Sequence, residues 1–539
     1  MHCVVRRFCW LSASACLFVL SSRAFATTCA ELRDVKVPST TIISAVDVPA
    51  GTFTPTYDKA PAKIYSATLP AFCRVIGVVH PVPESTIGFE VWLPLPAVWN
   101  HRIEGVGDGA YNGRISYGPL EDAIALGYAV SSTDTGHNGS DLKFVVDHPE
   151  RIIDWGYRAV HEMARATKPI VAAYYGTAAT HAYFNGCSTG GGQALSEAQR
   201  FPEDYDGIIA GDAGNDRVHL NVGFLWSFAA AHDGDKLVLP ESKLQLLHDA
   251  AIKACDAADG VKDGILEDPL SCRFDPGVIA CKASASAECL TPQEVEAARR
   301  IYAGPKNPRT GQQIIGGLMP GSEVIKGGDY SGWKNFITGP TDPSRLDFWK
   351  YWAFDDPKWD WHTFDYDHDI AIADERVAAV NASNPDLRPF QHRGGKLLVY
   401  HGWVDPVGPP ADAIDYFNAV EKVIGSPVKT AEFYRLFMVP GMSHCDGGDG
   451  YELAGGARGV DDPNGVPMWP HPDPMHDMLS ALDAWVTQGD APQQIIAAHY
   501  EGDKVIRTIP VCAFPKVARW TGKGSSDDAK NYICNMPKR

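Results

Sequence analysis

Residues 181–190 read His-Ala-Tyr-Phe-Asn-Gly-Cys-Ser-Thr-Gly, and this stretch decides the fold class that we predict for the whole chain. Its first half is apolar and favours a strand, and its second half, Gly186 to Gly190, matches the pattern Gly-x-Ser-x-Gly. A nucleophilic serine in this pattern occupies a sharp turn between a strand and a helix, where glycines allow close approach of the backbone. A turn serine without chemistry shows the same five residues, so the flanking elements must support Ser188.

The flanking sequence supplies those elements. Residues 191–200 predict a helix, and apolar strand-like runs alternate with helical stretches through the first half of the chain. The predicted strands are Val75–Val79, Phe89–Leu93, Ile103–Val106, Tyr128–Ser132, Tyr183–Asn185 and Ile208–Ala210, and the longest predicted helix is Trp155–Tyr175. This alternation favours a mainly parallel sheet in the α/β class.

The regular pattern stops after Gly211. From about residue 212 to 393 the chain is rich in Asp, Gly, Pro, Cys and aromatic residues, and strand character returns at Lys396–Tyr400. We therefore predict an α/β-hydrolase fold with a large inserted lid domain. The catalytic domain comprises residues 27–211 and 394–539, and the lid domain comprises residues 212–393.

The N-terminus indicates export. Residues 1–26 begin with a basic region at Arg6 and Arg7, continue with a short apolar run and end at an Ala-Phe-Ala cleavage site, which is the pattern of a signal peptide. The alternative, a membrane anchor, needs a longer apolar run. We expect a secreted or periplasmic protein with no membrane association after signal cleavage, and the sequence carries no signal for an oligomeric state.

Charge and cysteine content agree with export. The formal net charge of −18 argues against nucleic acid or an anionic membrane as a partner. Cleavage removes Cys3, Cys9 and Cys16 from the 13 cysteines and leaves an even set, which predicts a disulfide framework.

A serine hydroxyl needs a histidine to accept its proton and a carboxylate to orient that histidine. In this fold the acid and the histidine follow the serine in that order. Asp405 lies just beyond the strand that begins at Lys396, and His444 lies on a glycine-bearing loop after the apolar run that ends at Val439. Their order and strand-end positions make them the predicted partners of Ser188.

Two cysteines adjoin this predicted triad. Cys187 precedes Ser188, and Cys445 follows His444. If Ser188 and His444 are within hydrogen-bond reach, the neighbouring Cα atoms fall near the span of roughly 4.4 to 6.8 Å that a disulfide requires. A bridge between Cys187 and Cys445 would tie nucleophile to base, although unrelated pairings among the ten cysteines remain open.

Three segments together resemble one known family. The motif Gly186–Gly190, residues 199–207 (QRFPEDYDG) and Ser443–Cys445 are similar to the tannase and feruloyl esterase family, and the similarity extends over essentially the whole mature chain. The resemblance implies a triad of Ser188, Asp405 and His444, with a disulfide that joins Cys187 to Cys445.

The tetrahedral intermediate of acyl transfer needs backbone donors that face its oxyanion. We predict the amide of Thr189, which follows the nucleophile, and an amide from the loop after an early strand, either Gly107 or Asp108. A glycine turn without this role is the alternative.

A lid loop carries a concentration of carboxylates. Residues 255–265 read CDAADGVKDGI, and oxygen-rich loops of this kind suit Ca²⁺. The resemblance implies a structural calcium held by Asp256, Asp259 and Asp263 and by the carbonyls of Val261 and Ile265. The residues alone would favour a solvated acidic turn.

The remaining cysteines are expected to pair in four further bridges, of which the short-range ones follow from proximity in sequence: Cys29 with Cys73, Cys255 with Cys272, Cys281 with Cys289, and Cys512 with Cys534. The lid domain also carries an aromatic cluster, most of which we expect to pack its core: Phe348, Trp349, Tyr351, Trp352, Phe354, Trp359 and Trp361.

The predicted function is a secreted serine carboxylesterase that hydrolyses esters of aromatic acids of the hydroxycinnamic, feruloyl type through an acyl-enzyme. A tannase that acts on galloyl esters, or a chlorogenate or monoaryl terephthalate esterase, would use the same triad. From different classes, an inactive calcium-stabilised binding protein would lack the intact triad, and a metallohydrolase would need a ligand spacing such as His-Glu-x-x-His, which the sequence lacks.

Overall fold

The computed structural model describes residues 26–54, 65–282, 284, 286–338, 342–456, 472–502 and 504–537. The predicted signal segment lies outside these residues except for Ala26, and so do Cys3, Cys9 and Cys16. In the described part of the chain, no helix has the length and apolar character needed to span a bilayer.

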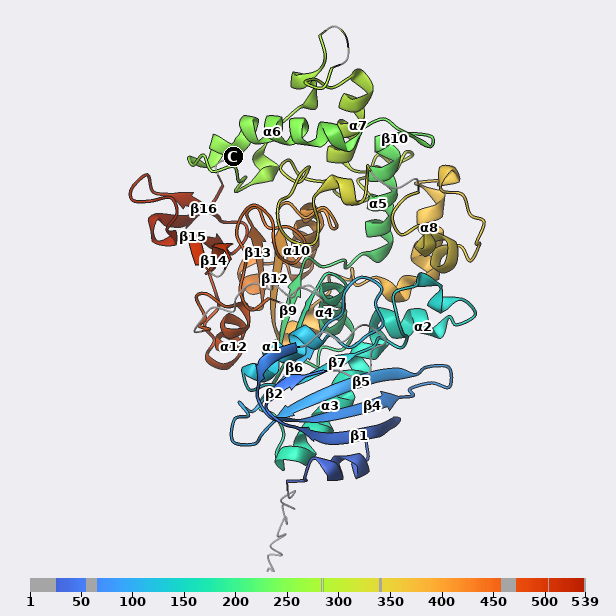
Figure 1. Cartoon of the computed structure of the whole chain (residues 1–539), viewed down its shortest axis with the longest axis vertical. Coiled ribbons are helices and arrows are strands. Elements are labelled where there is room, and N and C mark those ends of the chain that lie inside the picture. Colours follow the sequence, from blue (N-terminus) through green and yellow to red (C-terminus); the bar gives the residue numbers. More distant parts are fainter. Residues whose placement is uncertain are drawn as a thin grey trace, which may run out of the picture.

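The centre of the molecule is a mixed sheet of nine strands, which confirms the predicted α/β-hydrolase class (Figure 1). In spatial order the strands are β1 (Thr40–Val48), β4 (Phe72–Val79), β5 (Ile87–Pro94), β7 (Ala129–Thr133), β6 (Arg102–Val106), β8 (His181–Cys187), β9 (Gly207–Gly211), β12 (Lys396–Gly402) and β13 (Tyr434–Val439). The pairs β1–β4, β4–β5 and β5–β7 are antiparallel, and every pair from β7 to β13 is parallel. The carboxyl ends of β8, β9, β12 and β13 therefore meet at one edge, where ligands bind in open α/β sheets.

Helices cover both faces of the sheet. One core contains residues of α3 (Ala159–Tyr175), α4 (Thr189–Arg200) and α10 (Pro410–Ile424), and the other contains residues of α1 (Tyr117–Ala125) and α12 (Met478–Gln488). Adjacent strand residues alternate between the two cores: Phe184 belongs to the first and Tyr183 to the second. This is the period of two that a strand buried on both faces requires.

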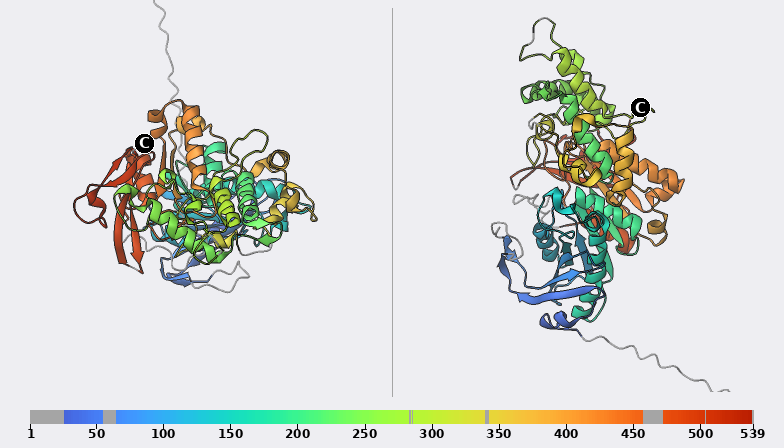
Figure 2. Two further views of the ribbon diagram at one scale, coloured as in Figure 1. Left: turned by 90° about the horizontal axis from the view of Figure 1, so that it is seen from above. Right: turned by 90° about the vertical axis from the view of Figure 1, so that its right-hand side faces the viewer.

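The long segment 212–393 leaves the sheet between two neighbouring strands. β9 pairs directly with β12, with Gly207 opposite Lys396, so the chain departs after β9 and returns beside it. We call residues 212–393 the lid segment. Its main helices are α5 (Arg217–Ala231), α6 (Leu244–Cys255), α7 (Pro292–Ala303) and α8 (His368–Arg376). Figure 1 shows α6 and α7 at the opposite end of the molecule from β1 and α8 lower down at one side, and the right-hand view of Figure 2 again shows the green helices far from the blue strands.

The aromatic cluster lies mainly in the core of the lid segment. Phe348, Trp349 and Trp352 are buried, and they pack with Tyr111 and Trp155 from the first part of the sheet domain. The remaining four aromatic residues of the predicted cluster pack against them while partly exposed. Two hairpins follow α12 near the C-terminus: β14 (Gln494–Glu501) with β15 (Lys504–Cys512), and β16 (Val517–Trp520) with β17 (Tyr532–Asn535).

All five expected cysteine pairs form disulfides. The Cα atoms of Cys29 and Cys73 are 5.7 Å apart, those of Cys187 and Cys445 5.9 Å, those of Cys255 and Cys272 5.5 Å, those of Cys281 and Cys289 4.9 Å, and those of Cys512 and Cys534 5.7 Å.

Candidate active site

Ser188 lies on the turn between β8 and α4. Its backbone has φ 61° and ψ −119°, a conformation that is strained for a residue with a side chain. The glycines on either side permit this turn: a Cβ atom on Gly186 would be 2.4 Å from the carbonyl oxygen of Gly190. The amide of Ser188 donates to the carbonyl of Gly211 at 2.9 Å, which fixes the turn against the end of β9.

The structure brings the three predicted triad residues together. His444 Nε2 is 2.8 Å from Ser188 Oγ, and His444 Nδ1 is 2.7 Å from Asp405 Oδ2. The other oxygen of Asp405 accepts from the amides of Val407 and Gly408 at 2.6 and 3.1 Å. The serine can therefore donate to the imidazole while the carboxylate holds the opposite nitrogen, which is the geometry of a serine nucleophile with its base and orienting acid.

Electrostatics keep the acid ionised. Asp405 is fully buried, and burial alone would raise its pKa, but the facing imidazoles of His444 and His401 hold the pKa well below its ordinary value. A carboxylate that stays charged can stabilise the imidazolium that forms when His444 accepts the serine proton.

The disulfide Cys187–Cys445 joins the residue before the nucleophile to the residue after the base. Cys445 has φ 70°, so the loop turns sharply immediately beyond His444. The bridge therefore limits the separation of the two loops on which Ser188 and His444 stand.

The predicted oxyanion donors need a correction. The amide of Gly107 donates to the carbonyl of Asn185 at 3.0 Å, and the amide of Asp108 donates to Oε1 of Gln193 at 3.1 Å. Both amides are engaged inside the protein because the loop after β6 packs against β8 and α4. The amide of Thr189 donates to no acceptor within the described residues, so its predicted role stays a prediction.

A different residue of the same loop, Ala110, lies beside Thr189. Ala110 has φ 50°, and its carbonyl accepts from Thr189 Oγ1 at 2.6 Å. Its amide has no acceptor in the part of the chain that the structure describes. The sequence showed the correct loop, but only the hydrogen bonds distinguish among its amides.

A buried cation, Arg217, lies next to Thr189, and sequence reasoning missed it. Arg217 of α5 is 3% exposed, and its Nη2 donates to Thr189 Oγ1 at 3.0 Å. Burial and the nearby Arg345 lower the pKa of Arg217 to about 10, so its guanidinium remains charged at neutral pH.

The lid segment also contacts the base of the triad. The ring of Tyr330, from the lid segment, lies against that of His444, with 5.5 Å between the ring centroids.

The predicted calcium ligands lie on one loop after α6. Asp256 Oδ1 accepts from the amides of Asp263 and Gly264, and Asp263 pairs with Arg507 at 3.2 Å. Burial, with the carboxylates of Asp263 and Asp256, raises the pKa of Asp259 to about 6. This accumulated negative charge and the oxygen donors fit Ca²⁺, but the trio is absent from the described ligand groups whose atoms lie within 4.8 Å of one another. The carboxylates would have to approach each other to share one ion.

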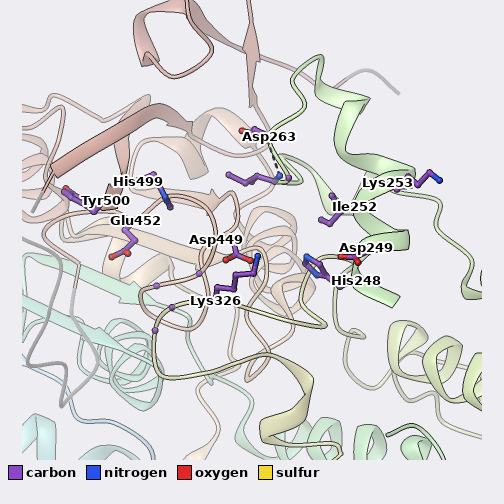
Figure 3. Close-up of a pocket in the computed structure, with 16 residues that line it drawn as sticks. His248, Asp249, Ile252, Lys253, Asp263, Lys326, Asp449, Glu452, His499 and Tyr500 are labelled. Carbon is purple, nitrogen blue, oxygen red and sulfur yellow. Dashed lines mark hydrogen bonds between the residues drawn. The ribbon is translucent and has the colours of Figure 1, made fainter. Parts of the chain in front are cut away.

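A cavity of about 780 Å³ lies between the lid segment and β14 (Figure 3). Its walls include His248 and Asp249 of α6, Asp449 from the loop that follows His444, and His499 of β14. None of the three triad residues lines it, so this cavity is separate from the reacting atoms.

Comparisons with known proteins agree with this geometry. Residues 73–535 match the family described as tannase and feruloyl esterase. The chain is 39% identical to an uncharacterized esterase of Xanthomonas campestris pv. campestris, over 96% of this chain and 92% of the relative. It is 31% identical to a probable feruloyl esterase B of Aspergillus clavatus, over 95% of this chain and 96% of the relative.

Solved structures show the same relationship. The crystal structure of feruloyl esterase B from Aspergillus oryzae superimposes with a TM-score of 0.86 at 28% identity, covering 94% of this chain and all of that one. Together with the strand-to-helix serine, the assembled triad and the adjoining disulfide, these similarities establish that the chain is a carboxylic ester hydrolase that belongs to the tannase and feruloyl esterase family.

Proposed function

We propose that this protein is an exported esterase that hydrolyses aromatic esters of the feruloyl, hydroxycinnamic type through an acyl-enzyme on Ser188. The observation that carries the mechanism is the contact of 2.8 Å between Ser188 Oγ and His444 Nε2. The likeness to feruloyl esterase B over nearly the whole chain supports the choice of substrate class.

In the first half of the reaction, Ser188 Oγ attacks the ester carbonyl while His444 Nε2 takes the serine proton. Asp405 stabilises the resulting imidazolium through Nδ1. The tetrahedral intermediate collapses, the C–O bond to the alcohol breaks, and His444 returns the proton to the departing alcohol. Water then attacks the acyl-serine by the same sequence and releases the aromatic acid.

We assign oxyanion stabilisation to the amides of Thr189 and Ala110. Both amides are unengaged within the described residues. Thr189 directly follows the nucleophile, and its hydroxyl donates to the carbonyl of Ala110. The buried guanidinium of Arg217, bonded to the Thr189 side chain, adds positive charge near the developing oxyanion.

A substrate panel tests the choice of ester. The measurement is kcat/KM for methyl ferulate, methyl gallate, chlorogenate and a monoaryl terephthalate ester, with Ser188→Ala as the control for background hydrolysis. Methyl ferulate should give the highest value, and a preference for chlorogenate would favour a chlorogenate esterase. A clear preference for methyl gallate would instead favour tannase activity, and a preference for the terephthalate ester would favour that class.

A fluorophosphonate probe separates an esterase from a binding protein with a dead site. The wild-type enzyme should be labelled at Ser188, and Ser188→Ala should not be labelled. A wild-type protein that neither reacts with the probe nor hydrolyses any ester would contradict the proposed mechanism.

We further propose that the loop of Asp256, Asp259 and Asp263, with the carbonyls of Val261 and Ile265, holds a structural Ca²⁺ in the lid segment. Support comes from the oxygen donors and from the pKa of Asp259, which burial and then the carboxylates of Asp263 and Asp256 raise. Metal analysis of the purified protein should find calcium. Its absence, with melting unchanged by a chelator, would refute this site.

We also propose that the protein is exported from the cytoplasm. The five disulfides agree with an oxidising compartment. N-terminal sequencing of the secreted or periplasmic protein should begin at Thr27. Recovery of an intact N-terminus from the cytoplasm would contradict export.

A further inference from the structure

A second histidine lies behind the acid of the triad. His401 stands near the end of β12, and its side chain is 1% exposed. Its Nε2 is 3.0 Å from the carbonyl oxygen of Gly408, 3.4 Å from Asp405 Oδ2 and 3.7 Å from Asp212 Oδ1. All three neighbours are oxygen acceptors, so Nε2 carries a proton and donates. Asp405 Oδ2 therefore lies between two imidazoles, those of His444 and His401.

A second buried carboxylate connects the elements that carry the triad. Asp212 follows β9 directly, and its side chain is fully buried. Its Oδ1 accepts from the amide of Gly402 at 2.8 Å, and its Oδ2 accepts from the amide of Cys445 at 3.2 Å. Gly402 ends the strand that leads to Asp405, and Cys445 follows His444. One side chain thus holds the acid strand and the base loop together.

Asp212 also adjoins the disulfide. Its Oδ2 is 3.6 Å from Cys187 Sγ, a contact without a hydrogen bond because a disulfide sulfur has no proton. The carbonyl of Gly211, the residue before Asp212, accepts a hydrogen bond from the amide of Ser188. The side chain is therefore packed against or bonded to the supports of all three triad residues.

The charged groups of this cluster act on one another: burial, with the carboxylate of Asp405, raises the pKa of Asp212 to about 7, while the imidazole of His401 opposes that rise. Burial lowers the pKa of His401, but the carboxylates of Asp212 and Asp405 outweigh burial and raise it to about 9. An imidazolium between two buried carboxylates offsets part of the repulsion that they would otherwise exert on each other. Asp212, His401 and Asp405 are also close enough to ligate a metal ion, but each already has hydrogen-bond partners in the protein.

We propose that Asp212 and His401 are a positioning pair for ester hydrolysis: Asp212 holds the base loop against the acid strand, and His401 holds Asp405 Oδ2 in line with His444. The inference rests on the proposed serine mechanism. Neither residue touches the reacting atoms. Because a displacement of about 1 Å can cost on the order of 100-fold in rate, loss of either support should act on the chemical step.

Conservative and non-conservative variants test the pair. Asp212→Asn keeps one acceptor oxygen, and His401→Gln keeps an N–H donor that can reach Gly408, whereas His401→Leu keeps no polar group. The matched control is Glu104→Gln, a buried carboxyl in β6 that contacts Asn185 and no triad residue. For each folded variant, kcat and KM for the best ester and the melting temperature are measured.

We expect Asp212→Asn to lower kcat at least about tenfold while KM stays within about threefold, because alignment of the base is lost and substrate contacts are kept. His401→Leu should lose more activity than His401→Gln. The double variant Asp212→Asn with His401→Gln should lose less than the product of the single losses, because paired residues are not additive. Glu104→Gln should keep kcat whatever its melting temperature.

The proposed positioning pair would be refuted if the folded single variants kept kcat within about threefold of wild type. It would also be refuted if the losses of the two single variants were fully additive in the double variant. If Asp212→Asn does not fold, the ratio between His401→Gln and His401→Leu decides, and equal kcat values would refute the role of His401. Fluorophosphonate labelling of wild type at Ser188 is measured in parallel. Absence of that labelling would overturn the proposed function, whereas normal labelling with unaffected variants would overturn only the positioning pair.

Discussion

Removal of the disulfide Cys187–Cys445 should affect both stability and rate. The bridge closes a loop with a sequence separation of 258 residues. In the chain-entropy model a loop of this length stabilises the folded state by about 5.5 kcal/mol, and native strain reduces the measured value. The bridge Cys281–Cys289, with a separation of 8 residues, corresponds to about 2.5 kcal/mol in the same model. The change tested is the double substitution Cys187→Ala with Cys445→Ala.

The rate effect follows from the position of the bridge. Its Cα–Cα distance of 5.9 Å spans the residues directly attached to Ser188 and His444. If the base loop relaxes by about 1 Å, kcat should fall on the order of 100-fold. The assay is kcat and chemical denaturation of the double variant, with Cys281→Ala and Cys289→Ala as the matched control, which should keep kcat.

Two results would refute this reasoning. One is a folded Cys187→Ala and Cys445→Ala variant with kcat close to wild type. The other is peptide mapping under non-reducing conditions that finds both cysteines as free thiols in the active enzyme. Either result would show that packing alone aligns His444 with Ser188.

Three further predictions concern charged groups. Asp405→Asn should lower kcat on the order of 10⁴-fold, because the amide favours the wrong tautomer of His444, and a near-normal kcat would point to another acid. Asp256→Ala with Asp263→Ala should lower calcium content and melting temperature together, because binding to the folded state adds stability; a loss of one without the other would separate metal from stability. The pKa of His401 is raised from an ordinary 6.5 to about 9, so the folded state holds a proton that the unfolded state releases between these pH values. Protonation of His401 therefore stabilises the folded state fully below pH 6.5, and this contribution is lost as pH rises through 9. Urea unfolding of wild type should show that decline in the free energy of unfolding, and His401→Gln should reduce it; equal pH slopes would contradict the assignment.

The local parts of this structure could be predicted from sequence because they rest on short-range physics. The strand, glycine turn and helix around Ser188 are contiguous, and the clash that a Cβ atom on Gly186 would make is with Gly190 of the same turn. The prediction of secondary structure failed for elements whose conformation depends on contacts with other segments. β1 was missed because it is an edge strand whose outer side chains, such as Ile43, are 50% exposed and give no strong apolar run. The helix predicted to begin at Trp155 begins instead at Glu150, because α2 (Glu150–Ile153), the π turn at Asp154–Arg158 and α3 follow one another without a break.

The triad residues and their order could be read from the sequence, since each stands at a strand end and each has a distinct chemical type. Contacts between distant segments could not be read, because a hydrogen-bond donor in the sequence does not reveal its acceptor. The amide of Asp108 is engaged by Gln193, which removes it from the oxyanion site, and this follows only from the packing of α4 against the loop after β6. The sequence placed Asp212 at the first position of the predicted lid domain. In the folded chain its side chain accepts a hydrogen bond from the amide of Cys445, 233 residues away. The sequence by itself determined which groups can react, and the tertiary structure decided which groups hold them in place, because burial and hydrogen bonding across the sheet edge depend on segments that meet only after folding.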